Sequence, residues 1–378
     1  MKIALALSGG GTRAAVFHLG VLKRLACSNL LESVTRLSTV SGGSLVAGLI
    51  MCRAGLKWPT SSEYLQVVFP ELERLLSTVN LFDIGTVARS PSQWRKVFWQ
   101  RASIVAALLE KRWDIRGSLK ELPDAPEWLI NTTCIQTGKN WRLSKHLMGD
   151  WVFGHNYDPP YSIAESIAAS AAVPYVIGAL KLAVPKDGWF SIDPSNENPL
   201  KRKEQTASLV SLWDGGAYEN LGIEPFFKLD RGMINCDEIL ISDASGPLPN
   251  NAGSSLLQVL KGNLASPRLF DITSDQIRGL RSRIFVHALT SGLASGALFR
   301  LGMSVRDVDI RVKRERSTSD YATFQTDKET SVALRYPTNL SALSKDDFLR
   351  VARHGFEVAD ATLTAYRPTL APSSISWS

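Results

Sequence analysis

Three serines lie close together in the stretch RLSTVSGGSLVAGL, and each hydroxyl is a candidate nucleophile. A nucleophilic serine on a sharp turn from a strand into a helix needs small residues two positions before and after it, so that strand and helix pack closely. Ser41 has Thr39 and Gly43 there, whereas Ser38 and Ser44 each have at least one larger neighbour. Ser44 also falls in the first helical turn, where a serine usually caps or packs. The spacing favours Ser41, although Thr39 replaces the first glycine of a complete GxSxG motif.

A glycine run, Gly9, Gly10 and Gly11, follows a short apolar strand and opens an apolar helix. Backbone amides without side chains can converge on an anion, and the helix N-terminus adds partial positive charge. Beside Ser41 these amides would form an oxyanion hole, in which one donor is typically worth about 10²- to 10³-fold in rate. Arg13 follows, and it either anchors the loop by hydrogen bonds or is an ordinary solvated arginine.

The same run, GGGTRA, also satisfies the dinucleotide-binding pattern GxGxxA. That pattern requires an acidic residue at the end of the second strand to bind a ribose. The nearby acid, Glu32, precedes the second strand, and Ser41 stands at its end. A Walker phosphate loop is excluded because no Gly-Lys-Ser/Thr follows. We therefore favour an oxyanion loop over a nucleotide site.

An aspartate ends another apolar strand in LWDGGAYEN, where Asp214 precedes Gly215 and Gly216. Asp-Gly by itself is typical of a surface turn. Beside a nucleophilic serine, however, this carboxylate could act as a base or orient one.

Two catalytic arrangements are open at this point. A Ser-His-Asp triad would run Ser41, Asp214 and then His287 or His354, which is a permitted chain order. The α/β-hydrolase fold usually has several strands before its nucleophile, whereas one strand precedes that of Ser41 here. A direct Ser-Asp pair is the more economical alternative.

Strands and helices alternate around these motifs. Ile3–Leu7 and Val34–Val40 each read as a strand followed by a glycine turn and a helix, which indicates a parallel sheet covered on both faces. Residues 57–124 have a helical pattern and are predicted to be a cap or insertion. Towards the C-terminus, helices are predicted at Ser274–Leu289 and Lys345–Tyr366, followed by a loose tail from about residue 367.

The composition is that of a folded protein: 44% of the 378 residues are hydrophobic. Lys and Arg outnumber Asp and Glu by 43 to 36, and the net charge of +7 mildly favours anionic partners. The four cysteines form no CxxC pair, so neither a zinc site nor a disulfide framework is indicated, and a cytoplasmic location fits. We expect neither a signal peptide nor a spanning helix, so any membrane contact should be peripheral.

The stretch SQWRKVFWQR has a composition suited to an anionic membrane interface. Its aromatic and basic residues are Trp94, Phe98 and Trp99 with Arg95, Lys96 and Arg101. The alternative is a cap helix whose aromatic side chains pack inward. No nucleic-acid motif accompanies it, and the basic stretch DVDIRVKRER is predicted to be a solvated strand or loop.

Three stretches together resemble the patatin-like phospholipase family. LSGGGTRAAVFHLGVLKRL is similar to its oxyanion loop and helix, TVSGGSLVAGL to its nucleophile elbow, and DGGAYEN to its Asp-Gly-Gly site. The resemblance implies a catalytic dyad of Ser41 and Asp214 that needs no metal, cofactor or histidine. The residues implied to assist this dyad are Gly9, Gly10 and Gly11 as oxyanion donors and Arg13, Gly43, Gly215 and Gly216 as supports.

The resulting prediction is an α/β three-layer sandwich of patatin type with a mainly parallel central sheet, a helical insertion and a C-terminal helical region. Residues 1–245 would form the catalytic domain and 246–378 a region packed on it. The predicted function is a serine lipid acyl hydrolase acting on phospholipid or another acyl-ester lipid, with peripheral contact to an anionic membrane and no nucleic-acid partner. Two alternatives are an α/β-hydrolase esterase with a histidine base and a catalytically inactive lipid-binding or scaffold protein of the same fold.

Overall fold

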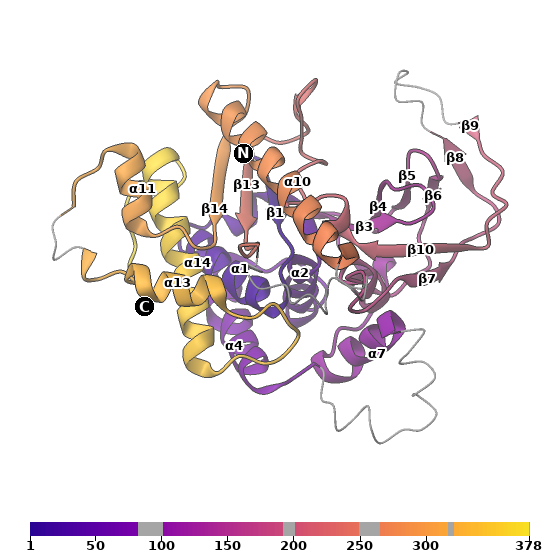
Figure 1. The fold of residues 1–378 in the computed structure, drawn as a ribbon, viewed down its shortest axis with the longest axis horizontal. Helices are drawn as coiled ribbons and strands as arrows, with labels where there is room; N and C mark the ends of the chain where they lie inside the picture. Colours follow the sequence, from indigo (N-terminus) through magenta and orange to yellow (C-terminus); the bar gives the residue numbers. More distant parts are fainter. Residues whose placement is uncertain (82–100, 192–200, 249–264, 317–320, 378) are drawn as a thin grey trace.

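The computed structural model describes residues 1–81, 101–191, 201–248, 265–316 and 321–377. Its main element is one mixed β-sheet whose central strands run parallel (Figure 1). The order across this parallel part is β14 (Gly296–Arg300), β13 (Glu238–Asp243), β1 (Ile3–Leu7), β2 (Val34–Val40) and β3 (Glu127–Cys134). The predicted strands at residues 3–7 and 34–40 are confirmed with the same bounds.

The sheet becomes antiparallel beyond β3. The strands that follow in order are β4 (Asn140–Leu143), β5 (Leu147–Asp150), β6 (Gly154–Tyr157), β8 (Trp189–Ser191) and β9 (Lys201–Arg202). A further strand, β10 (Leu209–Asp214), pairs antiparallel with the end of β3 and with β7 (Leu180–Ala183). A separate small sheet pairs β11 (Phe227–Lys228) with β12 (Gly232–Met233).

Strand β1 is buried on both faces, which explains the three layers. Ile3, Leu5 and Leu7 belong to a large core on one side of the sheet, whereas Ala4 and Ala6 belong to a smaller core on the other. All five side chains are fully buried. Because successive side chains of a strand point to opposite faces, both faces of this strand must be covered by other elements.

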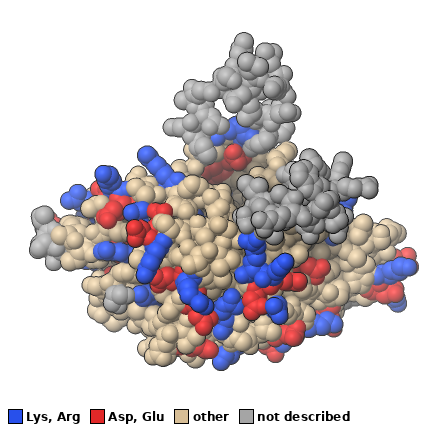
Figure 2. Space-filling view, turned by 90° about the horizontal axis from the view of Figure 1, so that it is seen from below, with Lys and Arg blue, Asp and Glu red and all other residues tan. Residues whose placement is uncertain are grey.

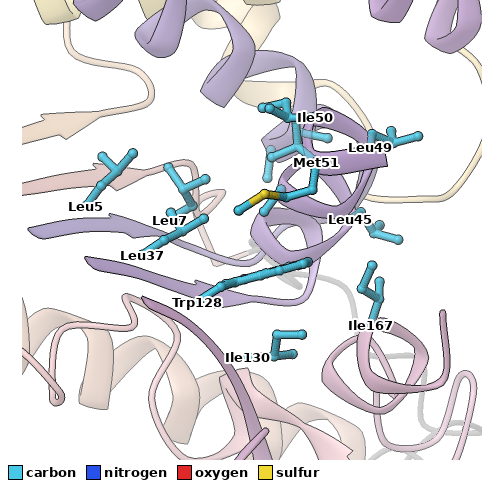
Figure 3. Packing of buried hydrophobic residues seen from close by; sticks show 14 of the residues in the cluster. Leu5, Leu7, Leu37, Leu45, Leu49, Ile50, Met51, Trp128, Ile130 and Ile167 are labelled. Atoms are coloured by element: carbon cyan, nitrogen blue, oxygen red, sulfur yellow. The ribbon is translucent and has the colours of Figure 1, made fainter. Parts of the chain in front are cut away.

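Helices supply that cover. Those that contribute to the large core include α1 (Gly11–Ala26), α2 (Gly42–Arg53) and α8 (Ile163–Ser170), and α10 (Ala265–Thr290) contributes to the smaller one. Figure 3 shows Leu7, Leu37 and Trp128 of the sheet near Leu45 and Met51 of α2. The predicted fold class, an α/β three-layer sandwich with a mainly parallel central sheet, is confirmed.

The segment predicted as a cap or insertion, residues 57–124, is helical over much of its described part. It contains α3 (Ser61–Glu63), a π-helical turn (Tyr64–Val68), α4 (Phe69–Thr78) and α7 (Arg101–Trp113). Its role as a cap stays a prediction. The candidate membrane-interface residues Trp94, Arg95, Lys96, Phe98 and Trp99 lie outside the described residues.

The C-terminal region adds β14 to the sheet and packs a long helix on the rest of the chain. That helix, α14 (Lys345–Tyr366), has the predicted bounds and lies beside α1 (Figure 1). It is preceded by α11 (Val305–Val312) and α13 (Asp327–Arg335). The prediction of a strand or loop at 307–316 is wrong over α11, because Ser304 and Asp307 form a capping box that starts a helix. The domain boundary at residue 245 stays a prediction.

The end of the chain is attached, so the prediction of a loose tail from about residue 367 is wrong for the described residues. The ammonium group of Lys23 lies 3.9 Å from the centre of the Trp377 ring. The N–H of Ile375 donates to the buried carboxylate of Asp360 at 3.0 Å. A buried carboxylate needs hydrogen-bond donors, and Ile375 provides one, while the ring of Trp377 adds a favourable cation–π contact with Lys23.

Acidic and basic side chains are interspersed on the face shown in Figure 2. Among the residues coloured on that face, Lys and Arg do not gather into one basic patch. Among the helices of the described residues, none has the length and apolar character needed to cross a membrane.

Candidate active site

Strands β2 and β10 meet end to end along one edge of β3. Asn131 of β3 pairs with Val40, the last residue of β2, and the next residue, Thr132, pairs with Asp214, the last residue of β10. Because β2 runs parallel to β3 and β10 antiparallel, the two strands arrive at this point from opposite directions. Ser41 follows Val40 directly, so two motifs far apart in the sequence become neighbours.

The backbone of Ser41 is strained, as expected for a sharp strand-to-helix turn. Its φ and ψ angles are 50° and −112°, a region that costs a non-glycine residue about 1–3 kcal/mol. The Ser41 N–H donates a hydrogen bond of 2.9 Å to the hydroxyl of Ser170, which helps to hold the turn. Its side chain is only 7% exposed. This geometry projects the Ser41 side chain away from the strand it follows.

The other two serines of the motif have structural partners. Ser44 shares hydrogen bonds of 2.8 Å with Ser170 and with Thr39, and the Thr39 hydroxyl accepts a bond of 2.9 Å from the indole N–H of Trp128. Ser38 accepts a bond from a buried asparagine of β3. A threonine at the position where the motif usually has glycine is therefore explained by a buried hydrogen-bonded chain.

Replacing Ser44 by alanine should leave the reactivity of Ser41 in place while lowering stability. The substitution removes one hydrogen bond each from the buried Thr39 and Ser170 hydroxyls, which keep Trp128 and the Ser41 N–H as their other partners, and the two lost bonds should cost about 1–3 kcal/mol together. Urea unfolding measures the loss, and labelling with a fluorophosphonate measures the reactivity. Label that disappears from a folded Ser44→Ala protein would identify Ser44 as the reacting hydroxyl.

Asp214 is a buried carboxylate with few partners. Its side chain accepts the N–H of Gly216 at 2.7 Å and interacts with the hydroxyl of Ser41. Burial raises the pKa of Asp214 from 3.8 to about 6, and these two hydrogen bonds lower it only in part. Gly215 allows this turn to approach β3, because a methyl group there would lie 2.5 Å from the carbonyl oxygen of Asn131.

The glycine loop borders Ser41. A methyl group added at Gly9 would lie 3.1 Å from Cβ of Ser41. The N–H of Gly9 donates to the carbonyl oxygen of Asn220 at 3.2 Å, whereas in the described residues the N–H groups of Gly10 and Gly11 have no protein acceptor. Of the three amides predicted to hold an oxyanion, Gly9 is thus paired, whereas Gly10 and Gly11 have no acceptor in the described residues, and their role as oxyanion donors stays a prediction.

Arg13 anchors the glycine loop. Its guanidinium donates to the carbonyl oxygens of Tyr336 at 2.8 Å, Leu334 at 3.2 Å and Ala244 at 3.4 Å. The residue is 4% exposed. These contacts favour the anchoring interpretation of Arg13 over the solvated one, and its support of catalysis stays a prediction.

Asn220 joins the glycine loop to the Asp-Gly-Gly turn, a role that sequence reasoning missed. Besides accepting from Gly9, it donates from its side chain to Ser245 at 2.9 Å, and its Oδ1 lies against both Gly9 and Gly216. The preceding Glu219 is buried and holds the next turn through backbone N–H groups, those of Leu221, Gly222 and Ile223. The only sequence signal was that Asn220 ends the DGGAYEN stretch.

The histidines proposed for a triad have other surroundings. His354 accepts the N–H of Gly302 at 2.8 Å and packs on Phe17, and burial lowers its pKa to about 4. His287 is exposed on α10. Among the described residues the carboxylate of Asp214 has no histidine partner. The geometry thus favours the direct Ser-Asp pair over the Ser-His-Asp triad.

No group of three or more His, Cys, Asp or Glu side chains in the described residues is arranged to hold a metal ion. The groups around Ser41 are instead hydroxyls, one carboxylate and backbone amides, which suit acyl transfer.

A serine on a strained elbow, a buried carboxylate beside it and a glycine loop on a mixed α/β sheet are features by which serine acyl hydrolases are recognised. The family model for patatin-like phospholipase matches residues 5–227. The chain belongs to the patatin-like phospholipase family, and this membership supports lipid acyl hydrolysis in general. No curated protein is similar enough to count as a relative.

Solved structures share the fold at low sequence identity. Human GIVD cytosolic phospholipase A2 matches with a TM-score of 0.59 and 14% identity, over 98% of this chain and 62% of that one. The same human protein in complex with methyl gamma-linolenyl fluorophosphonate matches with a TM-score of 0.54 and 15% identity, over 98% and 59%. This chain therefore spans about three fifths of the length of these structures. At such identities the likeness shows the fold alone.

Proposed function

We propose that this protein hydrolyses acyl esters of lipids, with Ser41 as the nucleophile and Asp214 as the general base. The observation that carries the proposal is the end-to-end meeting of β2 and β10 on β3, which leaves the Ser41 hydroxyl interacting with a buried carboxylate. Family membership supports the reaction class.

In the first half of the proposed reaction, Asp214 accepts the Ser41 proton as Oγ attacks the ester carbonyl carbon. The carbonyl oxygen takes the negative charge and accepts hydrogen bonds from the N–H groups of Gly10 and Gly11. The intermediate collapses, the bond to the alcohol oxygen breaks, and Asp214 returns the proton to the leaving alcohol. The acyl group is now esterified to Ser41.

In the second half, water attacks the acyl-enzyme. Asp214 accepts a proton from the water, and the resulting tetrahedral oxyanion accepts hydrogen bonds from the same two N–H groups, those of Gly10 and Gly11. Collapse breaks the bond to Oγ of Ser41, which regains the proton from Asp214. The products are a fatty acid and the original enzyme, so no metal or cofactor enters the balance.

The proposed substrates are phospholipids or related acyl-ester lipids. The protein would reach them in the cytoplasm, by peripheral contact with an anionic membrane surface. The net charge of +7 supports an anionic surface. Burial of Asp214 and Ser41 supports a substrate whose acyl chain displaces water from the site.

Labelling with a fluorophosphonate tests the proposal, because phosphorus is attacked by an activated serine and fluoride leaves. The expected result is one adduct, mapped by peptide sequencing to Ser41, and hydrolysis of phospholipid vesicles by the unlabelled protein. A folded protein that binds vesicles but neither labels nor hydrolyses would support the inactive lipid-binding alternative instead.

The rate should depend on the protonation of Asp214. Its pKa of about 6 means that the carboxylate is mostly protonated below that value and cannot accept the Ser41 proton. We expect kcat/KM for a soluble, uncharged ester to rise about tenfold per pH unit below pH 6 and to level off above pH 7. A pH profile from 4.5 to 8.5 measures it, and a flat profile would contradict Asp214 as the base.

A further inference from the structure

The C-terminal region contacts the glycine loop through residues 334–341, a segment that comprises the last two residues of α13 and the six that follow. The carbonyl oxygen of Asn339 accepts two hydrogen bonds from Thr12, one from its N–H at 2.9 Å and one from its hydroxyl at 3.1 Å. Thr12 is fully buried. This segment lies outside residues 5–227, which match the family model.

The same segment limits the position of Gly11. The φ angle of Gly11 is +64°, and a methyl group there would lie 2.5 Å from the carbonyl oxygen of Asn339. The backbone of the segment therefore lies directly against the backbone of Gly11. The N–H of Gly11 is one of the two loop amides without an acceptor in the described residues, and this contact restricts the backbone that carries it.

Arg13 adds a second attachment close by. Its bonds to the carbonyl oxygens of Leu334 and Tyr336 connect the residue after Thr12 to the start of the segment. Thr12 and Arg13 together thus attach the loop to three residues of the segment, Leu334, Tyr336 and Asn339.

The segment is itself held in place by hydrogen bonds beside α4 and by one of its own side chains. The Leu340 carbonyl oxygen accepts the N–H of Leu81, three residues after α4, at 3.3 Å. Just beyond the segment, the N–H of Leu343 donates to the carbonyl oxygen of Leu76 in α4 at 3.0 Å. Within the segment, the side-chain oxygen of Asn339 accepts the N–H of Ser341 at 3.1 Å. The Asn339 carbonyl is thus presented to Thr12 by a turn that is fixed on both sides.

We propose that residues 334–341 are a positioning element of the active site, in which Asn339, acting through Thr12, sets the direction of the Gly11 amide. The inference rests on the proposed function, since it assigns that amide to the oxyanion. It gives the C-terminal region a part in catalysis. Thr12 and Asn339 are positioning residues, because they act through the loop and not on the substrate.

Thr12→Val tests the proposal, because valine keeps the shape and the backbone N–H but loses the hydroxyl bond to Asn339. Removing a whole oxyanion donor costs about 10²- to 10³-fold, and we expect misdirecting one to lower kcat about tenfold with KM unchanged. Thr12→Ser keeps the hydroxyl and should therefore keep most of the wild-type rate. Asn339→Ala, which removes the bond to Ser341, should act like Thr12→Val.

Ser344→Ala is the matched control. Ser344 caps α14 a few residues further on, accepting the N–H of Asp347 at 3.1 Å, and it has no bond to the loop. Its loss should cost about 1 kcal/mol of stability, comparable with that of one buried hydrogen bond. If Ser344→Ala loses as much stability as Thr12→Val and Asn339→Ala but keeps its kcat, the loss of kcat in the other two comes from positioning and not from destabilisation.

The rate of fluorophosphonate labelling gives a second readout, because the phosphoryl oxygen binds where the oxyanion would. Labelling and kcat should fall together in Thr12→Val and Asn339→Ala and stay at the wild-type level in Ser344→Ala. An active wild type with unchanged Thr12→Val and Asn339→Ala kinetics would overturn this inference alone. A wild type without labelling or turnover would overturn the proposed function and the inference with it.

Discussion

Ser41→Ala and Asp214→Asn should each lower kcat/KM for ester hydrolysis by about 10⁴-fold or more. The first substitution removes the attacking atom, and the second removes the base while keeping the shape. Groups that act as a unit in acyl transfer lose nearly all of their combined effect when one is removed. The double variant should therefore be barely slower than either single one.

Asp214→Asn should also be as stable as the wild type, or more so, at neutral pH. A pKa raised from 3.8 to about 6 means that the folded protein disfavours the ionised carboxylate by about 3 kcal/mol. Asparagine is neutral and its oxygen can still accept the N–H of Gly216. The stability that protonated Asp214 contributes is fully present below pH 4 and is lost as the pH rises through 6. The variant should lack this dependence.

Turnover of a phospholipid and of a soluble ester measures the loss of kcat/KM. Urea unfolding at pH 4.5 and 7.5 measures the stability of Asp214→Asn relative to the wild type. An Asp214→Asn protein that is folded and retains more than a hundredth of the wild-type rate would remove Asp214 from the mechanism. Loss of activity together with loss of stability would point to a structural role instead.

Gly43→Ala should unfold the protein or destabilise it by about 3 kcal/mol or more. The added methyl group would lie 2.2 Å from the carbonyl oxygen of Leu7, and the conflict is between the backbone of α2 and the backbone of β1. Neither can rotate away, so overpacking must separate the helix from the sheet. Ser41, which joins β2 to α2, would lose its strained turn in the process.

Gly48→Ala in the same helix is the matched control. Its methyl group would lie 2.3 Å from Cδ1 of Ile167, a formally similar conflict with the tip of a flexible side chain. Alanine also favours a helix over glycine by about 1 kcal/mol, so stability should stay within about 1 kcal/mol of wild type. Denaturant unfolding of both variants measures the difference. Equal losses would mean that backbone contact at Gly43 is not what holds the elbow.

Local patterns were sufficient for much of the fold. Apolar strands followed by glycine turns predicted β1 and β2 with the observed bounds, because a buried parallel strand is a short apolar run. Ser344 and the acidic residues after it predicted the start of α14. Two segments were misjudged: α11, which a local capping box of Ser304 and Asp307 starts, and the tail, whose partners Lys23 and Asp360 lie far away in the sequence.

The sequence by itself determined the inventory of the site: Ser41 on a tight turn, a glycine loop before a helix, and Asp214 at a strand end. It did not determine which of these groups meet, because that depends on hydrogen-bond register between strands far apart in the chain. The tertiary structure decided it, through β3 pairing Val40 and Asp214 with adjacent residues. Contacts such as Asn339 with Thr12 leave no pattern in either segment, since a backbone carbonyl that accepts a bond can belong to any residue.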